Sequence, residues 1–209
     1  MRVADMLIIG LTGSIGMGKS TVAQRFRDRG IAVCDADAVV HELYGGAAAP
    51  LIEAAFPGTT AAGQVDRGKL AQALLAEPGR FQQLEAIVHP LVQAAERRFL
   101  QDRAATGAGM AVLEIPLLLE TGGNRRVDFV VVVSAPAEVQ SARVLARPGM
   151  TEERLSNLSS RQMSDADKRR AADFVVDTGQ PLEGTLAQVD KLIESLRGRT
   201  GTAFAAYWT

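Results

Sequence analysis

A glycine-rich segment near the N-terminus carries the clearest chemistry in this chain of 209 residues. From residue 10 it reads GLTGSIGMGKSTVA, and Gly13, Gly18, Lys19 and Ser20 fit the pattern G-x-x-x-x-G-K-[ST]. In such a loop, main-chain N–H groups approach phosphate oxygens, the lysine places a positive charge beside them, and the hydroxyl is a natural Mg²⁺ ligand. A glycine-rich turn that merely joins a strand to a helix is the structural alternative. The complete motif favours a site for a nucleoside triphosphate.

The elements on either side of this loop agree with that interpretation. Residues 6–11 form a short apolar run typical of a buried strand, and residues 20–29 have the pattern of a helix that ends at Gly30. The N-terminus of such a helix points unpaired N–H groups and the positive end of its dipole at the loop. The sequence therefore predicts a strand, a phosphate-binding loop and a helix in succession.

A pair of carboxylates follows the next apolar run. Residues 31–34 read IAVC, and Asp35 and Asp37 come directly after them, at the edge where open α/β sheets bind ligands. Either acid could instead cap a helix that starts there. Phosphoryl transfer needs an acid near the acceptor hydroxyl or the metal, and this requirement favours a chemical role for the pair.

Two further apolar runs indicate strands buried on both faces, at residues 111–119 and 127–133. Glu114 stands inside the first of them, where an unpaired carboxylate would be costly. We expect it either to lie at the end of the strand facing the phosphates or to pair with a cation.

Residues 38–105 have a helical pattern that differs from the strands around them. Apolar residues recur every three or four positions between Phe81 and Phe99, although Pro90 should kink this helix or begin a new segment. A helical insertion of this size could hold a second substrate. His89 precedes the proline, and taken by itself its position favours a packed or capping histidine over a catalytic one.

A cationic segment follows a helix expected at residues 136–147, with Pro136 in its first position. It contains Arg143, Arg147, Arg154, Arg161, Lys168, Arg169 and Arg170, against four acids. A solvated helical hairpin and a lid that closes over phosphates are both compatible with this pattern. A last strand at 174–176, a closing helix at 186–196 and a loosely ordered tail at 198–209 complete the expected elements.

The composition is that of an ordinary globular protein, with 47% hydrophobic and 22% charged residues and a formal net charge of −1. That charge gives no reason to expect nucleic acid as a partner. No apolar run is long enough for a membrane span, and the only cysteine, Cys34, falls in a strand where burial is expected. We expect a cytoplasmic protein without a membrane partner, as a monomer or weak homo-oligomer.

Taken together, these segments resemble the dephospho-CoA kinase family over nearly the whole of residues 7–196. The resemblance rests on GLTGSIGMGKST, DADAVVH from Asp35, VDRGKL from Val65, IVHPLV from Ile87, EIPLLLE from Glu114, QSARVLAR, and RQMSDADKRRAADFVVDTG. The phosphate loop is shared by a very large superfamily, whereas the DAD pair, the His-Pro pair and the PLL-x-E run are much more particular.

The resemblance implies a three-layer α/β/α fold with a central, mainly parallel sheet, a helical substrate-binding insertion and a lid. The implied divisions are a nucleotide-binding core at 6–40, 108–142 and 171–197, an acceptor-binding subdomain at 41–107, a lid at 143–170 and a tail at 198–209. It also implies transfer of phosphate from ATP, with Mg²⁺, to the ribose 3′-hydroxyl of dephospho-CoA.

Residue roles follow from the same resemblance. The catalytic residues implied are Asp37 as the base, Lys19, Arg143 and Arg147. The nucleotide would be held by Gly13, Ser14, Ile15, Gly16, Met17, Gly18, Lys19, Ser20 and Thr21, with Ser20 also on the metal. The acceptor would meet Asp35, Asp37, Asp66, Arg67, His89, Pro90, Leu117 and Glu120. Gln162 belongs to the lid motif.

Ser14, Met17, Leu119 and Thr178 depart from the pattern expected of the family, and Ser14 fits the loop only if its dihedral angles stay in an allowed region. Two alternative functions remain open. One is a kinase of another small metabolite, such as a nucleoside monophosphate or a shikimate-like acid. The other is a regulatory GTP switch, which the absence of an Asn-Lys-x-Asp sequence disfavours.

Overall fold

The computed structural model describes residues 5–160 and 162–209, so Arg161 of the cationic segment lies outside the described residues. The chain divides into two compact units. The core unit contains residues up to Cys34 and from Leu100 to the C-terminus, and the helical unit spans Asp35–Phe99. Each unit is considered by itself below.

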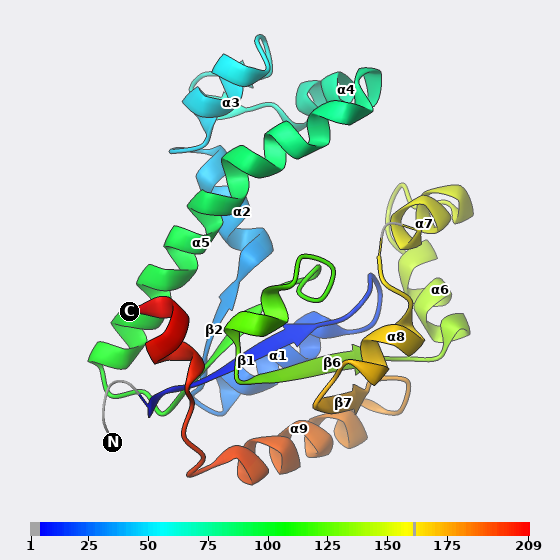
Figure 1. Ribbon diagram of the computed structural model, residues 1–209. Coiled ribbons are helices and arrows are strands. Elements are labelled where there is room, and N and C mark those ends of the chain that lie inside the picture. Colours follow the sequence, from blue (N-terminus) through cyan, green and yellow to red (C-terminus); the bar gives the residue numbers. More distant parts are fainter. Residues whose placement is uncertain (1–4, 161) are drawn as a thin grey trace. The chain divides into compact units, whose positions relative to one another are not determined.

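In the described residues of the chain, five strands form one sheet in the order β2-β5-β1-β6-β7 (Figure 1). The strands are β1 (Leu7–Thr12), β2 (Ala32–Asp35), β5 (Met110–Glu114), β6 (Phe129–Ser134) and β7 (Phe174–Asp177). The β1–β5, β1–β6 and β6–β7 pairs are parallel, and Gly10 of β1 lies opposite Leu113 of β5 and Val130 of β6. The helices of this unit are α1 (Lys19–Asp28), η3 (Gly123–Arg126), α6 (Ala137–Leu145), α7 (Glu152–Ser159), α8 (Asp165–Arg170), α9 (Leu182–Leu196) and η4 (Phe204–Trp208).

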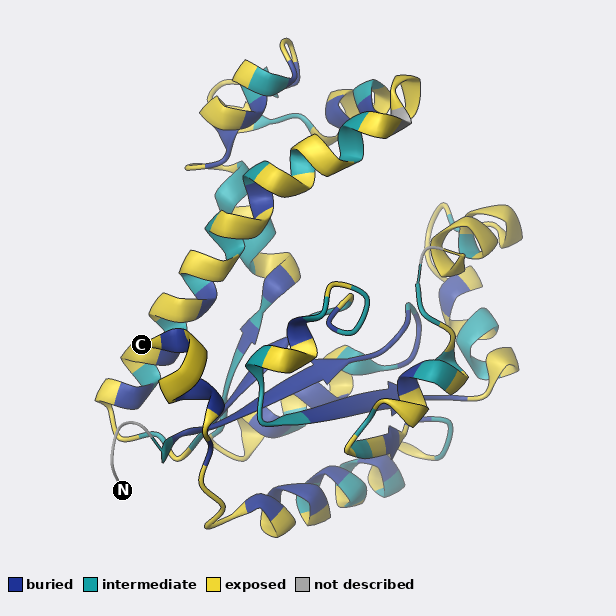
Figure 2. Ribbon diagram, viewed as in Figure 1, coloured by how far each residue is buried: buried dark blue, intermediate teal, exposed yellow. Residues whose placement is uncertain are grey.

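Both faces of this sheet are covered, which confirms the predicted three-layer α/β/α architecture. Alternate residues of β6 belong to different clusters: Val131 and Val133 pack with α1 and α9, whereas Val130 and Val132 pack with Leu118 on the other face. A strand buried on both faces has no polar alternation, and this explains the continuous apolar runs in the sequence. Figure 2 shows the middle of the sheet, formed by β1, β5 and β6, as the most continuously buried part of the core unit.

The predicted strand at residues 111–119 is wrong in its second half. The strand β5 ends at Glu114, and a turn begins at Pro116 that folds back through a hydrogen bond from the Thr12 hydroxyl to the Pro116 carbonyl. Proline has no N–H to continue a ladder, and this accounts for the early end. Pro136 lies one position before the predicted one, as the N-cap of α6.

The expectation of a loosely ordered tail at 198–209 is also wrong. Phe204 and Trp208 are buried, and the Trp208 indole N–H donates to the Arg126 carbonyl at 2.8 Å. The Asp128 carboxylate accepts from the main-chain N–H groups of Thr202 and Ala203 at 2.7 and 2.9 Å. The order of this segment therefore comes from contacts with distant parts of the core unit.

The helical unit contains α2 (Ala36–Tyr44), α3 (Ala49–Ala55), β3 (Thr60–Ala61), β4 (Gln64–Val65), α4 (Arg67–Ala76), η2 (Pro78–Arg80) and α5 (Phe81–Ala105) up to Phe99. One detail differs from the expectation of helices throughout, because β3 and β4 form an antiparallel hairpin. The helix α5 continues through Pro90, so the proline does not begin a new segment. The unit has its own core around Ile52, Phe56 and Leu70.

A carboxylate shared by two arginines joins α1 to α9 in the core unit. Arg25 Nε and Nη2 donate to Asp190 at 2.8 and 2.6 Å, and Arg29 makes the same pair of contacts. These hydrogen bonds hold the pKa of the Asp190 carboxyl well below its usual value. A group with a lowered folded-state pKa adds stability above its unfolded pKa and loses that contribution as the pH falls.

We therefore expect Asp190→Asn to lower the melting temperature near pH 7, and the difference from the wild type to shrink below about pH 4. Thermal unfolding of both proteins across this range measures the effect. Glu194→Gln is the comparison variant on the same helix, because within the described residues Glu194 forms an exposed ion pair with Arg197 and makes no hydrogen bond to Arg25 or Arg29. A difference between wild type and Asp190→Asn that stays constant down to about pH 3 would contradict the expectation.

Candidate active site

The loop between β1 and α1 has the backbone that its glycines predict. Gly16 and Gly18 adopt left-handed conformations, with φ of 78° and 82°. A Cβ on Gly16 would lie 2.5 Å from the Val144 side chain, and one on Gly18 would lie 3.2 Å from Thr178. Both positions therefore require glycine for conformation and for space. Ser14 is not among the described non-glycine residues with positive φ, so its dihedral angles stay in the region allowed to a residue with a side chain.

The end of this loop carries several main-chain N–H groups that could bind a ligand. The Met17 N–H donates to the Ser14 carbonyl at 3.1 Å and closes the turn. In the part of the chain that the structure describes, the N–H groups of Gly16, Gly18, Lys19 and Ser20 have no acceptor. Lys19 and Ser20 also begin α1, where the helix dipole adds partial positive charge. Such a row of donors binds phosphate oxygens.

Lys19 pairs with a buried carboxylate. Its Nζ lies 2.9 Å from Oε1 of Glu114, which is 2% exposed at the end of β5. Arg27 Nη2 lies 3.8 Å from the other oxygen of the same carboxylate. From the sequence we expect Glu114 either to lie at the end of its strand or to pair with a cation. In the structure it does both. Sequence reasoning left Glu114 out of the site, because the partner lysine is 95 residues away.

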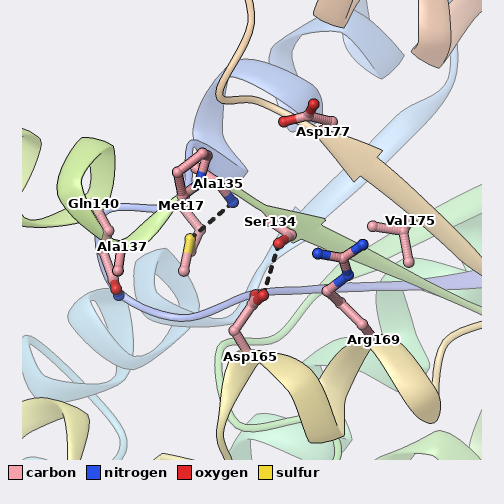
Figure 3. A pocket seen from close by; sticks show the side chains of 10 residues that line it. Met17, Ser134, Ala135, Ala137, Gln140, Asp165, Arg169, Val175 and Asp177 are labelled. Atoms are coloured by element: carbon pink, nitrogen blue, oxygen red, sulfur yellow. Dashed lines mark hydrogen bonds between the residues drawn. The ribbon is translucent and has the colours of Figure 1, made fainter.

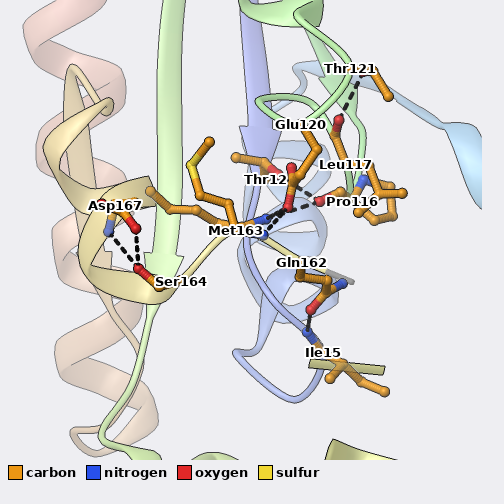
Figure 4. A network of polar contacts seen from close by, with 11 residues as sticks. Thr12, Ile15, Pro116, Leu117, Glu120, Thr121, Gln162, Met163, Ser164 and Asp167 are labelled. Atoms are coloured by element: carbon orange, nitrogen blue, oxygen red, sulfur yellow. Dashed lines mark hydrogen bonds and ion pairs between the residues drawn. The ribbon is translucent and has the colours of Figure 1, made fainter. Parts of the chain in front are cut away.

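The segment at 143–170, which the sequence predicts to be a lid, is attached to the core unit at both of its ends. At the first end, Arg143 of α6 donates to the Thr178 carbonyl at 2.7 Å and to its hydroxyl at 3.2 Å. At the second end, Lys168 is fully buried and its Nζ lies 2.9 Å from Glu120 Oε1, which also accepts from the Met163 N–H at 2.8 Å (Figure 4). Between these ends, α7 has no buried residue. Glu120, expected at the acceptor site, is thus engaged by the lid.

Arg147 differs from Arg143. It lies just beyond the end of α6, its side chain is exposed, and it makes no side-chain hydrogen bond or ion pair with another described residue. Its guanidinium is therefore available to a ligand, whereas that of Arg143 is occupied by Thr178.

A cavity of about 360 Å³ lies at the carboxyl ends of β6 and β7 in the core unit (Figure 3). Met17 reaches it from the phosphate loop, and its sulfur accepts the Ala135 N–H at 3.1 Å. The Ser134 hydroxyl donates to Asp165 on its wall at 2.8 Å. The departure at Met17 thus has a structural role, since the thioether joins the loop to the start of α6.

In the helical unit, the two acids of the DAD sequence have different environments. Asp35 is the N-cap of α2, and its Oδ1 accepts from the N–H groups of Asp37 and Ala38 at 2.9 and 3.2 Å. The capping alternative therefore holds for Asp35. Asp37 is exposed in the first turn of α2, and its carboxylate makes no hydrogen bond to the described residues. Asp37 is thus the acid of the pair that has no capping contact, whereas one carboxylate oxygen of Asp35 is engaged in the cap.

Asp37 lies on the wall of a cavity of about 470 Å³ within the helical unit. The cavity is lined by Asp37, Val40, Tyr44, Arg67, Leu70, Ala71, Leu74 and Leu84. Arg67 stacks over the Tyr44 ring at 5.4 Å, and its Nη2 lies 3.2 Å from His41 Nδ1. Burial raises the pKa of the Tyr44 phenol, which keeps it neutral at physiological pH. A mostly apolar cavity with a few polar groups on its wall is typical of a site for a small organic molecule.

The other residues expected at the acceptor site lie in varied places. Asp66 caps α4 by accepting from the N–H groups of Gly68 and Lys69. His89 and Pro90 are exposed on α5, and His89 has no side-chain partner among the described residues. Leu117 is 38% exposed in the turn after β5. Of the acceptor residues predicted from sequence, the cavity brings together Asp37 and Arg67.

Oxygen donors suited to Mg²⁺ lie beside Lys19. The Ser20 residue is exposed at the start of α1, and the Glu114 carboxylate is bonded to the neighbouring Lys19. Hydroxyl and carboxylate oxygens are the ligands this ion prefers. Within the described ranges, no group of three or more His, Cys, Asp or Glu residues could form an all-protein metal centre. The donor set thus fits an ion held together with nucleotide phosphates.

In the described parts of the chain, no helix has the length and apolar character needed to cross a bilayer.

Comparison with known proteins agrees with this geometry. The family model described as dephospho-CoA kinase matches residues 7–183. A dephospho-CoA kinase of Mesorhizobium japonicum is 56% identical over 197 residues, which cover 94% of this chain and 100% of the relative.

Solved structures agree as well. A crystal structure from Thermus thermophilus has a TM-score of 0.80 at 35% identity and covers 93% of this chain and 100% of that one. The dephospho-CoA kinase from Campylobacter jejuni has a TM-score of 0.70 at 22% identity, covering 94% and 98%, and supports the fold. With the family model matching well over half of its length, the chain belongs to the dephospho-CoA kinase family.

Proposed function

We propose that this protein phosphorylates dephospho-CoA, with the phosphate loop holding ATP and the cavity of the helical unit holding the acceptor. The reaction transfers the γ-phosphoryl group of ATP to the ribose 3′-hydroxyl and yields coenzyme A and ADP. The observation that carries the ATP assignment is the row of unpaired N–H groups beside Lys19 at the start of α1. Family membership supports the acceptor.

In this proposal, the polar groups of the two units have different roles in the reaction. The N–H groups of the loop and Lys19 bind the β- and γ-phosphates of ATP. Asp37 accepts the proton of the 3′-hydroxyl group. As that proton leaves, the hydroxyl oxygen bonds to the γ-phosphorus, and the bond from the γ-phosphorus to the β-phosphate oxygen breaks. Arg147 stabilises the charge that develops on the transferred group.

Mg²⁺ supplies neutralisation of charge on the β- and γ-phosphates in reactions of this class. Ser20 would be its ligand from this chain, with Glu114 the nearest carboxylate partner of Lys19. Glu114 has a second task whether or not an ion is bound. Because it pairs with Lys19 at 2.9 Å, it fixes the position of the ammonium group at the end of a flexible side chain.

The activity is tested by incubating the purified protein with ATP, Mg²⁺ and dephospho-CoA and identifying coenzyme A and ADP by mass spectrometry. Shikimate and nucleoside monophosphates serve as competing acceptors in the same assay. Coenzyme A formed in preference to the other products is expected. A folded protein that phosphorylates another acceptor, or none, would refute the proposal.

Arg67 provides a sharper test of the acceptor cavity. We expect Arg67→Ala to raise the KM for dephospho-CoA by about tenfold or more, because a charge-assisted contact to the diphosphate of the substrate is lost. The KM for ATP and the turnover number should change little. Steady-state kinetics with each substrate varied in turn measures the three values.

Lys69→Ala is the matched control, since Lys69 is a cation on the same helix that does not line the cavity. Equal effects of the two substitutions would mean that general charge, rather than the cavity, binds the acceptor.

A further inference from the structure

Two glutamine side chains hold a single residue of the phosphate loop. Gln140 Nε2, from α6, donates to the Ile15 carbonyl at 2.8 Å. Gln162 Oε1, from the segment before α8, accepts the Ile15 N–H at 3.2 Å (Figure 4). Gln140 precedes the exposed part of the lid and Gln162 follows it. Both ends of the lid therefore meet the same residue of the loop.

The chemistry of the main chain fixes the orientation of both carboxamides. An N–H group requires an acceptor, so Gln162 must present its oxygen to Ile15, and its NH₂ group faces away. A carbonyl requires a donor, so Gln140 must present its NH₂ group. Gln140 therefore acts as a donor and Gln162 as an acceptor, and neither side chain can take the other's role.

Each contact also fixes the direction of a neighbouring group, because a trans peptide is planar and its N–H and C=O point in opposite directions. The Ile15 carbonyl shares its peptide with the Gly16 N–H. By holding that carbonyl, Gln140 turns the Gly16 N–H away from its own carboxamide. The Ile15 N–H shares its peptide with the Ser14 carbonyl, which accepts from Met17 at 3.1 Å and closes the loop.

The surrounding contacts leave little room for these peptides to rotate. A Cβ built on Gly16 would lie 2.5 Å from Val144 and 3.1 Å from the Gln140 carbonyl, so α6 lies directly against the loop. On the other side, the Met163 N–H donates to Glu120, whose carboxylate is paired with the buried Lys168. The segment that carries Gln162 is thus held by the hydrogen bond of the next residue, Met163, to Glu120.

We propose that Gln140 and Gln162 are positioning residues, through which the two ends of the lid aim the loop's N–H groups at the nucleotide phosphates. The Gly16 N–H is one of the donors without an acceptor in the described residues, and its direction depends on the peptide that Gln140 holds. The inference rests on the proposed binding of ATP.

The test compares methionine and glutamate at the two positions in the full-length protein, with the dissociation constant of Mg²⁺-ATP measured by calorimetry. Methionine is similar in length to glutamine but lacks the carboxamide, so each methionine variant loses the one hydrogen bond that its glutamine makes to Ile15. Gln140→Met and Gln162→Met should therefore each weaken ATP binding by about tenfold. Glutamate keeps an acceptor but has no donor when ionised. Gln162→Glu should therefore bind ATP about tenfold more tightly than Gln140→Glu.

The added negative charge is the same in both glutamate variants, and both side chains meet the same residue, so their difference isolates hydrogen-bond polarity. Dephospho-CoA affinity and melting temperature, measured in parallel, separate a local effect from loss of the fold. Ser160→Ala, an exposed change two residues before Gln162, should leave ATP affinity unaltered.

Equal ATP affinities for the two glutamate variants, or wild-type affinity in both methionine variants, would overturn the inference. If the Gln140 variants do not fold, Gln162→Met decides: it must bind ATP more weakly than the wild type while its affinity for dephospho-CoA stays unchanged. A wild-type protein that binds no ATP would instead refute the proposed function.

Discussion

Replacing Arg147 with alanine is expected to lower kcat by about 10³, the scale on which arginines that meet a transferred phosphoryl group act. The structure distinguishes Arg147 from its neighbour on the lid. Arg143 is held by two hydrogen bonds to Thr178, whereas the exposed Arg147 side chain is available to a ligand. An arginine that meets the phosphoryl group mainly in the transition state should affect kcat more than the KM for ATP.

The neighbouring variants sharpen this prediction. Arg143→Ala should lower kcat less than Arg147→Ala, because its guanidinium already has a partner at the end of β7. Arg147→Lys keeps the charge but loses the planar fork, and we expect an intermediate rate. Arg197→Ala, at the exposed end of α9, is the control for general loss of positive charge. Single-turnover kinetics at saturating ATP would measure the chemical step. A larger loss for Arg143→Ala than for Arg147→Ala would reverse the assignment.

The sequence was sufficient where the interactions are local. The phosphate loop could be predicted because its glycines, lysine and serine are adjacent, and because a strand and a helix must flank them. The burial of β6 on both faces followed from its unbroken run of valines. The end of β5 was missed, although Pro116 supplied a local signal for it.

The interactions that complete the site are not local, and no period in the sequence encodes them. Glu114 meets Lys19 across 95 positions, and Gln162 meets Ile15 across 147. The tail lacks any helical period, yet Phe204 and Trp208 are buried because the core unit offers them apolar surface and the Asp128 carboxylate binds the preceding turn. Only the folded core brings these partners together.

The two acids of the DAD sequence show how local structure divides equivalent residue types. One carboxylate oxygen of Asp35 accepts hydrogen bonds from the first turn of α2. Replacing Asp35 by a residue that cannot cap would therefore remove a helix cap as well as any chemical role. Asp37 follows two residues later, inside the helix, where its side chain has no capping task. The same spacing that made both acids candidates therefore leaves one of them structural.

Asp37→Asn is accordingly expected to lower kcat by about 10² to 10⁴, the usual contribution of a general base, with little change in ATP affinity. The amide matches the carboxylate in size but cannot accept the proton of the acceptor hydroxyl. Because Asp37 makes no hydrogen bond to the described residues, the substitution removes no contact of the folded helical unit. The melting temperature should therefore remain close to that of the wild type, and rates measured at saturating concentrations of both substrates give kcat.

Asp35→Asn is the matched comparison, since asparagine is also a good N-cap and preserves the start of α2. If Asp37 is the base, the Asp37 variant loses far more activity than the Asp35 variant, and the loss cannot be recovered by raising the concentration of dephospho-CoA. Near wild-type turnover in Asp37→Asn would show that the acceptor hydroxyl loses its proton to another group. A rise in KM alone would instead make Asp37 a binding residue on the wall of the cavity, and the transfer would then depend on positioning by the phosphate loop and Arg147.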